Sequence, residues 1–510
     1  MTIVLALLSG ALCAASFPKF GAPAVAWIAL APLIVSAALA ARSRASFFRR
    51  PVFLGFASGL VYFVGTIYWL AGVMSTYGGL PAWLGVLIAL LLAAYLALYP
   101  AAFALLVGIA VRRFGIGGVW LAPIFWVATE WLRGSVGPAF PWVPLGASQA
   151  SVIPVVQLAS VTGVYGLSVL VALVSTGAAA VALSRRRSQW VGFAGVGVLL
   201  VAVALGGAFR VMSGRLTTTG QVLRVGLLQG NVEQDVKWNP AFREPILRRY
   251  LDLSRQAVGA GANLVIWPEA SLPFYFESDA SSAEPIRRLA AESRTPFIVG
   301  TDEVIVTNGG ADLLYNSAVL VGADGRSRGS YRKIELVPFG EYVPFKRMLF
   351  FASRLVDAVS DFSPGVEPVV FDVNGGRVSV AICYESIYPW LSRKFVQRGS
   401  ELLAVITNDA WFGRSSAAYQ HFELGALRAV EEGRYLVRAA NTGISGAVDP
   451  YGRAILKTRL FEPASVTVDV RLLQDRTIYS RTGDLVAWLA LAVTAGFLFV
   501  ARREIVRGVP

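Results

Sequence analysis

The feature that most restricts how this chain can fold is a series of eight apolar runs. They cover residues 3–17, 22–41, 52–73, 83–111, 117–133, 161–183, 190–210 and 484–502. A helix of about 20 apolar residues spans the roughly 30 Å hydrocarbon core of a bilayer. Only 15% of the residues are charged, against roughly 25% in soluble domains. We therefore predict a polytopic α-helical membrane domain with eight transmembrane helices, of which the first and fifth are short.

Arginine-rich segments predict the orientation of these helices. They lie at 41–51, 111–115, 184–189 and 501–508, and each follows an even-numbered run. Because loops rich in Lys and Arg stay on the cytoplasmic side, we expect both termini in the cytoplasm. The long segment between the seventh and eighth runs is then on the opposite side. The first run lacks a basic leader and an A-x-A-like cleavage site, so we expect it to be retained as a helix.

Segment 212–483 has the mixed composition of a folded domain outside the membrane. Apolar strand patterns such as 221–231 alternate with helical patterns such as 241–261, which ends at glycine. Continuous apolar strands separated by helices are typical of layered α/β domains whose sheets are covered by helices. We therefore predict three parts: a membrane domain with seven helices at 1–211, the α/β domain, and a last helix with a cytoplasmic tail at 484–510.

The charge and the scarcity of metal-binding side chains exclude several classes of function. The net charge is +14, but the arginines cluster beside apolar runs, which suits contact with an anionic membrane surface. A basic stripe with interleaved aromatic residues is missing, so no nucleic-acid partner is expected. One histidine and two cysteines provide neither a zinc-type ligand cluster nor a disulfide framework. Without a phosphate loop or dinucleotide fingerprint, we predict no metal and no cofactor.

Three reactive side chains stand where predicted strands end, the place where α/β domains collect their chemistry. Glu269 follows NLVIWP, Lys333 follows GSYR and Cys383 follows RVSVAI. Taken singly, each also suits an ordinary role, as a solvated acid, a surface lysine or a buried strand thiol. A thiol nucleophile needs a lowered pKa or a neighbouring base. The only imidazole, His421, lies in a helical pattern more typical of packing, so a carboxylate and a lysine are the remaining candidates.

Three motifs resemble those of a known family. WPEAS at 267–271, YRKIELVPFGEYVPF at 331–345 and AICYESIYP at 381–389 are similar to the catalytic motifs of the nitrilase superfamily, with its Glu-Lys-Cys triad. A domain of this kind between a seventh and an eighth span resembles the membrane-embedded branch, the apolipoprotein N-acyltransferases. Further similar stretches are QGNVEQDVKWNP, LLYNSAVL, TNDAWFG and AANTGISGAVDPYG. The resemblance implies an extracytoplasmic nitrilase-like α-β-β-α sandwich, periplasmic to a bacterial inner (cytoplasmic) membrane.

The resemblance also implies a role for each residue of the triad. Cys383 is expected to be the nucleophile, Glu269 the general base, and Lys333 the group that stabilises the oxyanion together with the backbone N–H of Tyr384. This division is physically reasonable, because a carboxylate near a desolvated thiol takes its proton and an ammonium holds developing negative charge.

Seven further residues are candidates for the site, and three of them, Glu341, Glu385 and Trp238, resemble residues of the family. Two acids and a pocket tyrosine are expected to support the triad: Glu341, Glu385 and Tyr384. Four residues are expected to contact substrate: Trp238, Asn316, Phe339 and Phe345. Asn316 also suits a role in orienting the strand that leads to Lys333. Structural roles stay open for all seven, namely salt bridges for the acids, packing for the aromatic residues and a turn for the asparagine. The Phe-rich segment 337–355 suits contact with a lipid interface.

The reaction implied by the resemblance is a ping-pong acyl transfer. A phospholipid similar to phosphatidylethanolamine gives its sn-1 chain to Cys383, and the thioester acylates the α-amino group of an apolipoprotein's diacylglyceryl-cysteine. The expected partners are this donor, this acceptor and the membrane, with the enzyme as a monomer. Two hypotheses compete with this one. A membrane-anchored amidase would resolve the thioester with water, and a transporter or scaffold would carry an inactive domain. The second is disfavoured because charges inside the runs are nearly absent apart from Glu130.

Overall fold

Two compact units make up the chain. The structure, a computed structural model, describes residues 1–41, 48–234, 237, 239–306, 312–342 and 361–507. One unit comprises Met1–Ser75, Pro81–Ser213 and Arg481–Pro510, and the other comprises Thr76–Leu80 and Gly214–Ser480. Every strand in the described part of the chain lies in the second unit.

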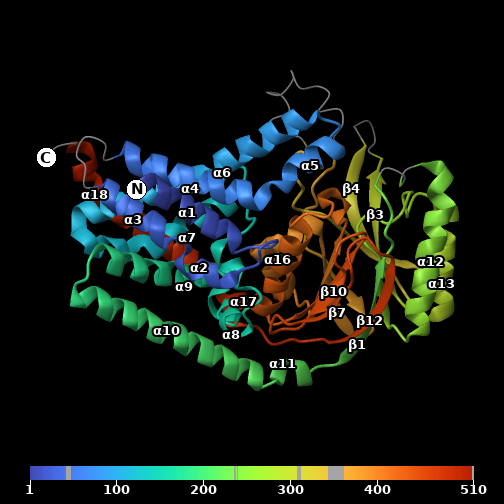
Figure 1. Ribbon diagram of the computed structural model, residues 1–510. Coiled ribbons are helices and arrows are strands. Elements are labelled where there is room, and N and C mark those ends of the chain that lie inside the picture. Colours follow the sequence, from blue (N-terminus) through green and yellow to red (C-terminus); the bar gives the residue numbers. More distant parts are fainter. Residues whose placement is uncertain (42–47, 235–236, 238, 307–311, 343–360, 508–510) are drawn as a thin grey trace. The chain divides into compact units, whose positions relative to one another are not determined.

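The first unit is built from apolar helices (Figure 1). They are α1 (Thr2–Ala15), α2 (Pro23–Ala29), α3 (Ala31–Ala40), α4 (Arg49–Ile67), α5 (Trp69–Thr76), α6 (Ala82–Phe114), α7 (Ala122–Ser135), α8 (Ile153–Val156), α9 (Ala159–Leu183), α10 (Arg187–Met212) and α18 (Leu485–Arg507). Six helical segments of the described residues are long and apolar enough to cross a membrane: Pro23–Ala40, Arg49–Ile67, Ala82–Ser135, Ala159–Leu183, Arg187–Thr218 and Leu485–Arg502. These helices identify a membrane protein.

Six segments differ from the eight predicted runs at two places. Helix α1 has 14 residues, about 21 Å at 1.5 Å per residue, which is shorter than the hydrocarbon core. Helices α6 and α7 belong to one segment of 54 residues. Yet the rings of Phe103 on α6 and Trp126 on α7 pack edge to face, with centroids 5.1 Å apart. The chain therefore folds back near the 3-10 helix η2 (Gly115–Leu121), and the number of membrane crossings stays a prediction.

Glu130, the acid inside the predicted runs, has a structural role in this unit. It is buried and accepts hydrogen bonds from Leu145 N at 2.6 Å, Ser168 Oγ at 2.5 Å and Trp126 Nε1 at 3.1 Å. A buried carboxylate with several donors is satisfied in place. These contacts tie α7 to the segment after it and to α9, which favours a structural group over part of an ion pathway.

The second unit contains two six-stranded sheets. The first has the order β12-β1-β2-β3-β4-β5 and the second has the order β11-β10-β9-β8-β7-β6. The strands of the first are β1 (Val222–Gln229), β2 (Leu264–Ile266), β3 (Phe297–Ile305), β4 (Leu313–Val321), β5 (Ser327–Arg332) and β12 (Ala464–Arg471). Those of the second are β6 (Val370–Val373), β7 (Gly376–Ile382), β8 (Leu402–Thr407), β9 (Tyr435–Ala440), β10 (Gly446–Val448) and β11 (Ala454–Lys457). The sheets meet where β1 lies against β9.

Helices cover the sheets, as predicted for this α/β domain. Helices α12 (Arg243–Gly259) and α13 (Ala280–Ser293) lie against the first sheet (Figure 1), and α15 (Pro389–Gln397) and α16 (Ala417–Glu432) lie with the second. Apolar residues of α12 recur three and four positions apart, which gives the helix one face to bury. On that face Tyr250 stacks on Trp267 at a ring-centroid distance of 4.8 Å.

Strand direction brings the candidate residues to one place in this unit. Strand β2 is parallel to β1 and β3, and β8 is parallel to β7 and β9. The carboxyl ends of parallel strands lie at the same edge of a sheet, where α/β domains place their ligands. Strand β5 runs in the same direction as β3, because both pair antiparallel with β4. The segments that follow β2, β5, β7 and β8 therefore supply most of the candidate site.

Candidate active site

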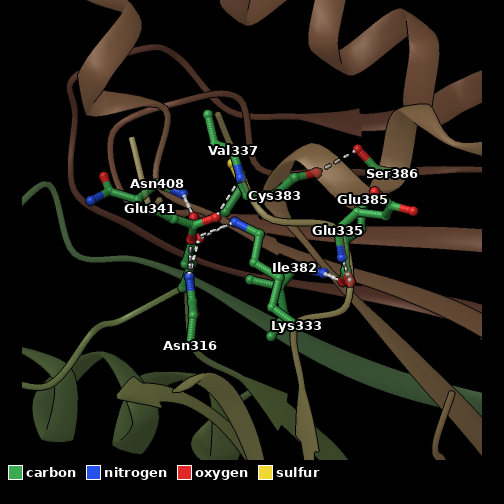
Figure 2. A network of polar contacts seen from close by, with 12 residues as sticks. Asn316, Lys333, Glu335, Val337, Glu341, Ile382, Cys383, Glu385, Ser386 and Asn408 are labelled. Carbon is green, nitrogen blue, oxygen red and sulfur yellow. Dashed lines mark hydrogen bonds and ion pairs between the residues drawn. The ribbon is translucent and has the colours of Figure 1, made fainter. Parts of the chain in front are cut away.

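The three residues predicted as a triad are brought together by the strand ends. Lys333 directly follows β5, Glu269 lies three residues after β2, and Cys383 begins the 3-10 helix η6 (Cys383–Ile387) after β7. Lys333 Nζ lies 3.2 Å from Glu269 Oε1. Both charged groups act electrostatically on the Cys383 thiol. Figure 2 shows Cys383 and the end of the Lys333 side chain within one polar cluster.

Backbone geometry places the Cys383 thiol at a turn rather than inside a strand. The residue has φ +52°, in the left-handed region that few non-glycine residues adopt. Its carbonyl oxygen accepts a hydrogen bond from Ser386 Oγ at 2.9 Å and lies 3.0 Å from His421 Nε2. Backbone strain of this kind often marks reactive positions. The turn ends strand β7 at the sulfur-bearing residue.

The surroundings of the thiol determine how it can react. Cys383 is 7% exposed. Burial and the neighbouring Glu269 raise the pKa of the Cys383 thiol above its usual value, while Lys333 opposes this rise. The resting thiol is therefore protonated at neutral pH. A protonated thiol attacks a carbonyl only if a base takes its proton during the attack. Glu269 is the carboxylate that acts most strongly on this thiol.

Two carboxylates share the ammonium group of Lys333. Its Nζ lies 2.8 Å from Glu341 Oε1 as well as 3.2 Å from Glu269 Oε1. The side chain of Asn316 donates to the same two oxygens, at 2.8 Å and 2.7 Å. Burial alone would lower the pKa of Lys333, but Glu341 and Glu269 outweigh it and raise that pKa well above its usual value. Lys333 is therefore a fixed positive charge.

A backbone N–H that the sequence did not indicate completes the environment of Glu269. Asn408 N donates to Glu269 Oε2 at 2.7 Å, so each oxygen of this carboxylate has a donor. Asn408 follows β8 within the stretch TNDAWFG, which carried no assigned role. On β3, Gly300 lets the Glu269 segment approach, because a Cβ there would stand 2.0 Å from the carbonyl oxygen of Pro268. Neither contact follows from spacing along the sequence.

Glu385 joins the lysine segment to the turn that carries Cys383. Its Oε1 accepts from Tyr331 OH at 2.7 Å, from Ile334 N at 2.6 Å and from Glu335 N at 3.2 Å. Its Oε2 accepts from Ile382 N at 2.7 Å. Burial raises the pKa of Glu385 to about 7, against the lowering effect of these donors. The side chain thus links the residues on either side of Lys333 to the residue before Cys383.

The other supporting residues pack around the turn. Tyr384 is buried, and its ring lies edge-on to that of Tyr388 with centroids 5.3 Å apart. The Glu341 carboxylate, in addition to its contact with Lys333, accepts from Val337 N through Oε2 at 2.8 Å. This bond closes the loop that follows the lysine. Figure 2 shows Glu341, Val337 and Lys333 together.

The single histidine contacts the turn that carries Cys383. His421 is fully buried on α16. Its Nε2 contacts the carbonyl oxygen of Cys383 and the hydroxyl of Ser386, both at 3.0 Å. Its Nδ1 lies 3.0 Å from Asp409 and 2.9 Å from Arg438. Burial, then Arg438, lowers the pKa of His421, so the ring is neutral and both nitrogens are engaged by groups other than the thiol. This arrangement favours packing over a role as base.

Comparison with known proteins gives the family. Residues 9–177 match the apolipoprotein N-acyltransferase N-terminal domain, and residues 224–475 match carbon-nitrogen hydrolase. A relative named apolipoprotein N-acyltransferase from Geobacter metallireducens is 41% identical over 505 residues, covering 98% of this chain and 95% of its own. The chain belongs to the apolipoprotein N-acyltransferase family. A Shewanella oneidensis protein of the same name is 34% identical, with 95% and 92% of the two chains covered.

Among solved structures, an amidase from Nesterenkonia sp. AN1 is 21% identical to this apolipoprotein N-acyltransferase family member. The match has a TM-score of 0.37 and covers 49% of this chain and 94% of the amidase.

The structure describes two of the four residues that we expected to contact substrate. Asn316 lies within strand β4 rather than in a turn. Its side-chain amide donates hydrogen bonds to Glu269 and Glu341. Phe339 is half-buried with φ +61°, and its N–H donates to Tyr342 O at 2.7 Å. Trp238 and Phe345 lie outside the described residues. Within the described ranges, no group of three or more His, Cys, Asp or Glu residues could hold a metal ion.

Proposed function

We propose that Cys383 carries an acyl chain from a phospholipid to an amine. In the first half-reaction the sulfur attacks the sn-1 ester carbonyl, and Glu269 takes the thiol proton. The negative charge of the tetrahedral intermediate is stabilised by Lys333 and by the backbone N–H of Tyr384. When the ester C–O bond breaks, Glu269 returns the proton to the leaving alcohol oxygen. The products are a thioester on Cys383 and a lysophospholipid.

The second half-reaction uses the same groups in the same order. The α-amino group of an apolipoprotein's diacylglyceryl-cysteine attacks the thioester, and Glu269 takes a proton from the attacking nitrogen. Collapse of the tetrahedral intermediate breaks the C–S bond, forms the amide and returns the proton to the sulfur. Dividing one ester-to-amide exchange into two easier steps is the advantage of covalent catalysis.

One observation supports this proposal above all others. The Lys333 ammonium is 1% exposed and lies 3.2 Å from Glu269 Oε1 and 2.8 Å from Glu341 Oε1, in electrostatic contact with a buried thiol whose pKa is raised. The thiol therefore gives up its proton only during the attack, and the lysine keeps its charge throughout. The three side chains therefore divide the work of nucleophile, base and oxyanion stabiliser without a histidine.

The partners and the location belong to the same proposal. The donor is a phospholipid similar to phosphatidylethanolamine, the acceptor is a diacylglyceryl apolipoprotein, and the enzyme acts as a monomer without a cofactor. The family supports a bacterial inner membrane location. The arginine pattern supports an orientation with both termini cytoplasmic and the catalytic unit periplasmic. A reporter fused near Gly325, in the turn between β4 and β5, should be active in the periplasm. A cytoplasmic signal there would overturn the orientation.

The nucleophile is tested by the mass of the protein after exposure to phospholipid. Purified protein mixed with phosphatidylethanolamine in detergent micelles should gain the mass of one acyl chain. The chain has two cysteines, both buried, so each provides the control for the other. Cys383→Ala should gain nothing, and Cys13→Ala should gain the chain at the wild-type rate. An adduct on Cys383→Ala at the wild-type level would remove Cys383 as the nucleophile.

A further inference from the structure

A second pair of buried charges lies beside the candidate triad and takes no part in the reaction described above. Asp302 on β3 is 8% exposed, and Lys237, on the loop after β1, is 4% exposed. Fully buried acids and lysines are rare unless opposite charges compensate them. We call Lys237 and Asp302 the flanking charges.

Strand register connects Asp302 to the site. Asp302 pairs directly with Asn316 across the antiparallel strands β3 and β4. Residues directly opposite each other in such a pair extend their side chains from the same face of the sheet. The Asn316 amide is the group that bridges Glu269 and Glu341. Oδ1 of Asp302 has no hydrogen-bond partner among the described residues.

Side-chain amides connect the loop of Lys237 to the same carboxylate. Asn408, whose N–H binds Glu269, donates through Nδ2 to Gln234 Oε1 at 2.6 Å. Asn441 Nδ2 donates to the carbonyl oxygen of Val232 at 2.7 Å and to Asn408 Oδ1 at 3.1 Å. The loop after β1 is thereby held against the end of β8. Burial lowers the pKa of Lys237, and the charges of Asp302 and Glu269 oppose this lowering.

The charge balance of the cluster shows why two lysines are needed. The acids in mutual electrostatic contact are Glu269, Glu341 and Asp302, and the cations are Lys333 and Lys237. Three carboxylates with one lysine would hold two net negative charges in a buried place, which favours protonation of one acid. The second lysine reduces this to one. Burial raises the pKa of Asp302 to about 6, in keeping with a crowded group of acids.

We propose that Lys237 and Asp302 are positioning residues that set the proton affinity of Glu269 in opposite directions. This inference rests on the proposed role of Glu269 as the base. The groups that face Glu269 are then Lys333, Glu341, Asp302, Lys237 and the Cys383 thiol. Lys237 keeps the carboxylate ionised before attack, and Asp302 keeps it basic enough to accept the thiol proton.

The test is the pH dependence of adduct formation on Cys383, measured with labelled phosphatidylethanolamine in detergent micelles. Protonation of Glu269 produces the acid limb of this profile. Lys237→Met should move the acid limb to higher pH, and Asp302→Asn should move it to lower pH, each by about half a unit or more. The double variant should return close to the wild-type position. If Lys237 and Asp302 had a purely structural role, both substitutions would lower the rate of adduct formation without moving the acid limb in opposite directions.

The next residue along the strand provides a matched control. Glu303 alternates to the other face of the sheet, where it forms an ion pair with Arg332 at 2.8 Å. Glu303→Gln should leave the acid limb in place. The inference would be overturned if the acid limbs of Lys237→Met and Asp302→Asn stayed at the wild-type pH. It would also be overturned if both limbs moved in the same direction. An absent wild-type adduct would instead refute the proposed function.

Loss of one buried charge can also prevent folding, and the double variant covers that case. If neither single variant folds, recovery of the wild-type melting temperature in Lys237→Met/Asp302→Asn supports two compensating charges. If the double variant also fails to fold, or melts no higher than a single variant that does fold, the charges do not compensate each other and the inference is wrong.

Discussion

Replacing Glu385 by alanine should loosen the junction between the nucleophile turn and the lysine segment. The buried carboxyl group accepts from Tyr331 OH and from the backbone N–H groups of Ile382, Ile334 and Glu335. Alanine leaves these four donors without their acceptor. At about 1 kcal/mol for each donor, the free energy of unfolding should fall by roughly 4 kcal/mol. At about 2–4 °C per kcal/mol for a domain of this size, the melting temperature should fall by about 10 °C.

The variant Glu385→Gln separates the effect of losing hydrogen bonds from the effect of losing an ionisable group. It keeps one acceptor oxygen for the three donors on Oε1, so Glu385→Gln should melt well above Glu385→Ala. Burial raises the pKa of Glu385 to about 7, above the ~4.3 of an exposed glutamate, so the folded state binds this proton more tightly than the unfolded state. The resulting stabilisation is complete below about pH 4 and is lost as pH rises through 7.

The assay is thermal unfolding of the purified protein in detergent between pH 5 and pH 8, with adduct formation on Cys383 measured in parallel. The stability of wild type relative to Glu385→Gln should decrease as pH rises through 7. Glu385→Ala should also slow the adduct, because Lys333 is held by the segment that Glu385 anchors. An alanine variant that melts within about 2 °C of wild type would refute the reasoning.

Three other substitutions test the contacts of the site. Asn316→Asp replaces the shared donor of Glu269 and Glu341 by a third acid, and should slow adduct formation at least ~100-fold; a rate within threefold of wild type would contradict the bridge. Glu341→Gln should lower the pKa of Lys333 and so bring the alkaline limb of the adduct profile down in pH, whereas an unchanged limb would show that Glu341 does not hold the lysine's charge. His421→Leu should lower the melting temperature but keep the adduct rate of the folded protein within tenfold, since loss of a general base costs roughly 10²–10⁴.

The sequence predicted which residues meet at the candidate site better than it predicted the contacts that hold them. Glu269, Lys333 and Cys383 were found because polar residues after apolar strands stand out against the pattern, and because parallel strands end at a common edge. The role of Asn408 could not be found in this way. It acts through its backbone N–H, 139 residues from Glu269 and in the other sheet, and the packing of two sheets leaves no periodic signal.

The membrane unit shows the same limit. Hydropathy found the apolar runs, because composition alone decides whether a segment suits lipid. It also predicted a break between the runs 83–111 and 117–133, which is where the chain folds back between α6 and α7. It could not predict which helix faces pack, such as Phe103 against Trp126. The sequence indicated Glu341 as an acid that supports the triad, but not that it shares the Lys333 ammonium with Glu269.

The acyl chain's second transfer provides the most direct test of the central claim. Protein carrying a labelled acyl group on Cys383 is separated from phospholipid and mixed with a peptide that begins with diacylglyceryl-cysteine and has a free α-amino group. We expect the label to leave Cys383 and to appear on the peptide as an amide, with little free fatty acid. Release of the label as free fatty acid, at the same rate with or without the peptide, would contradict acyl transfer and identify a hydrolase.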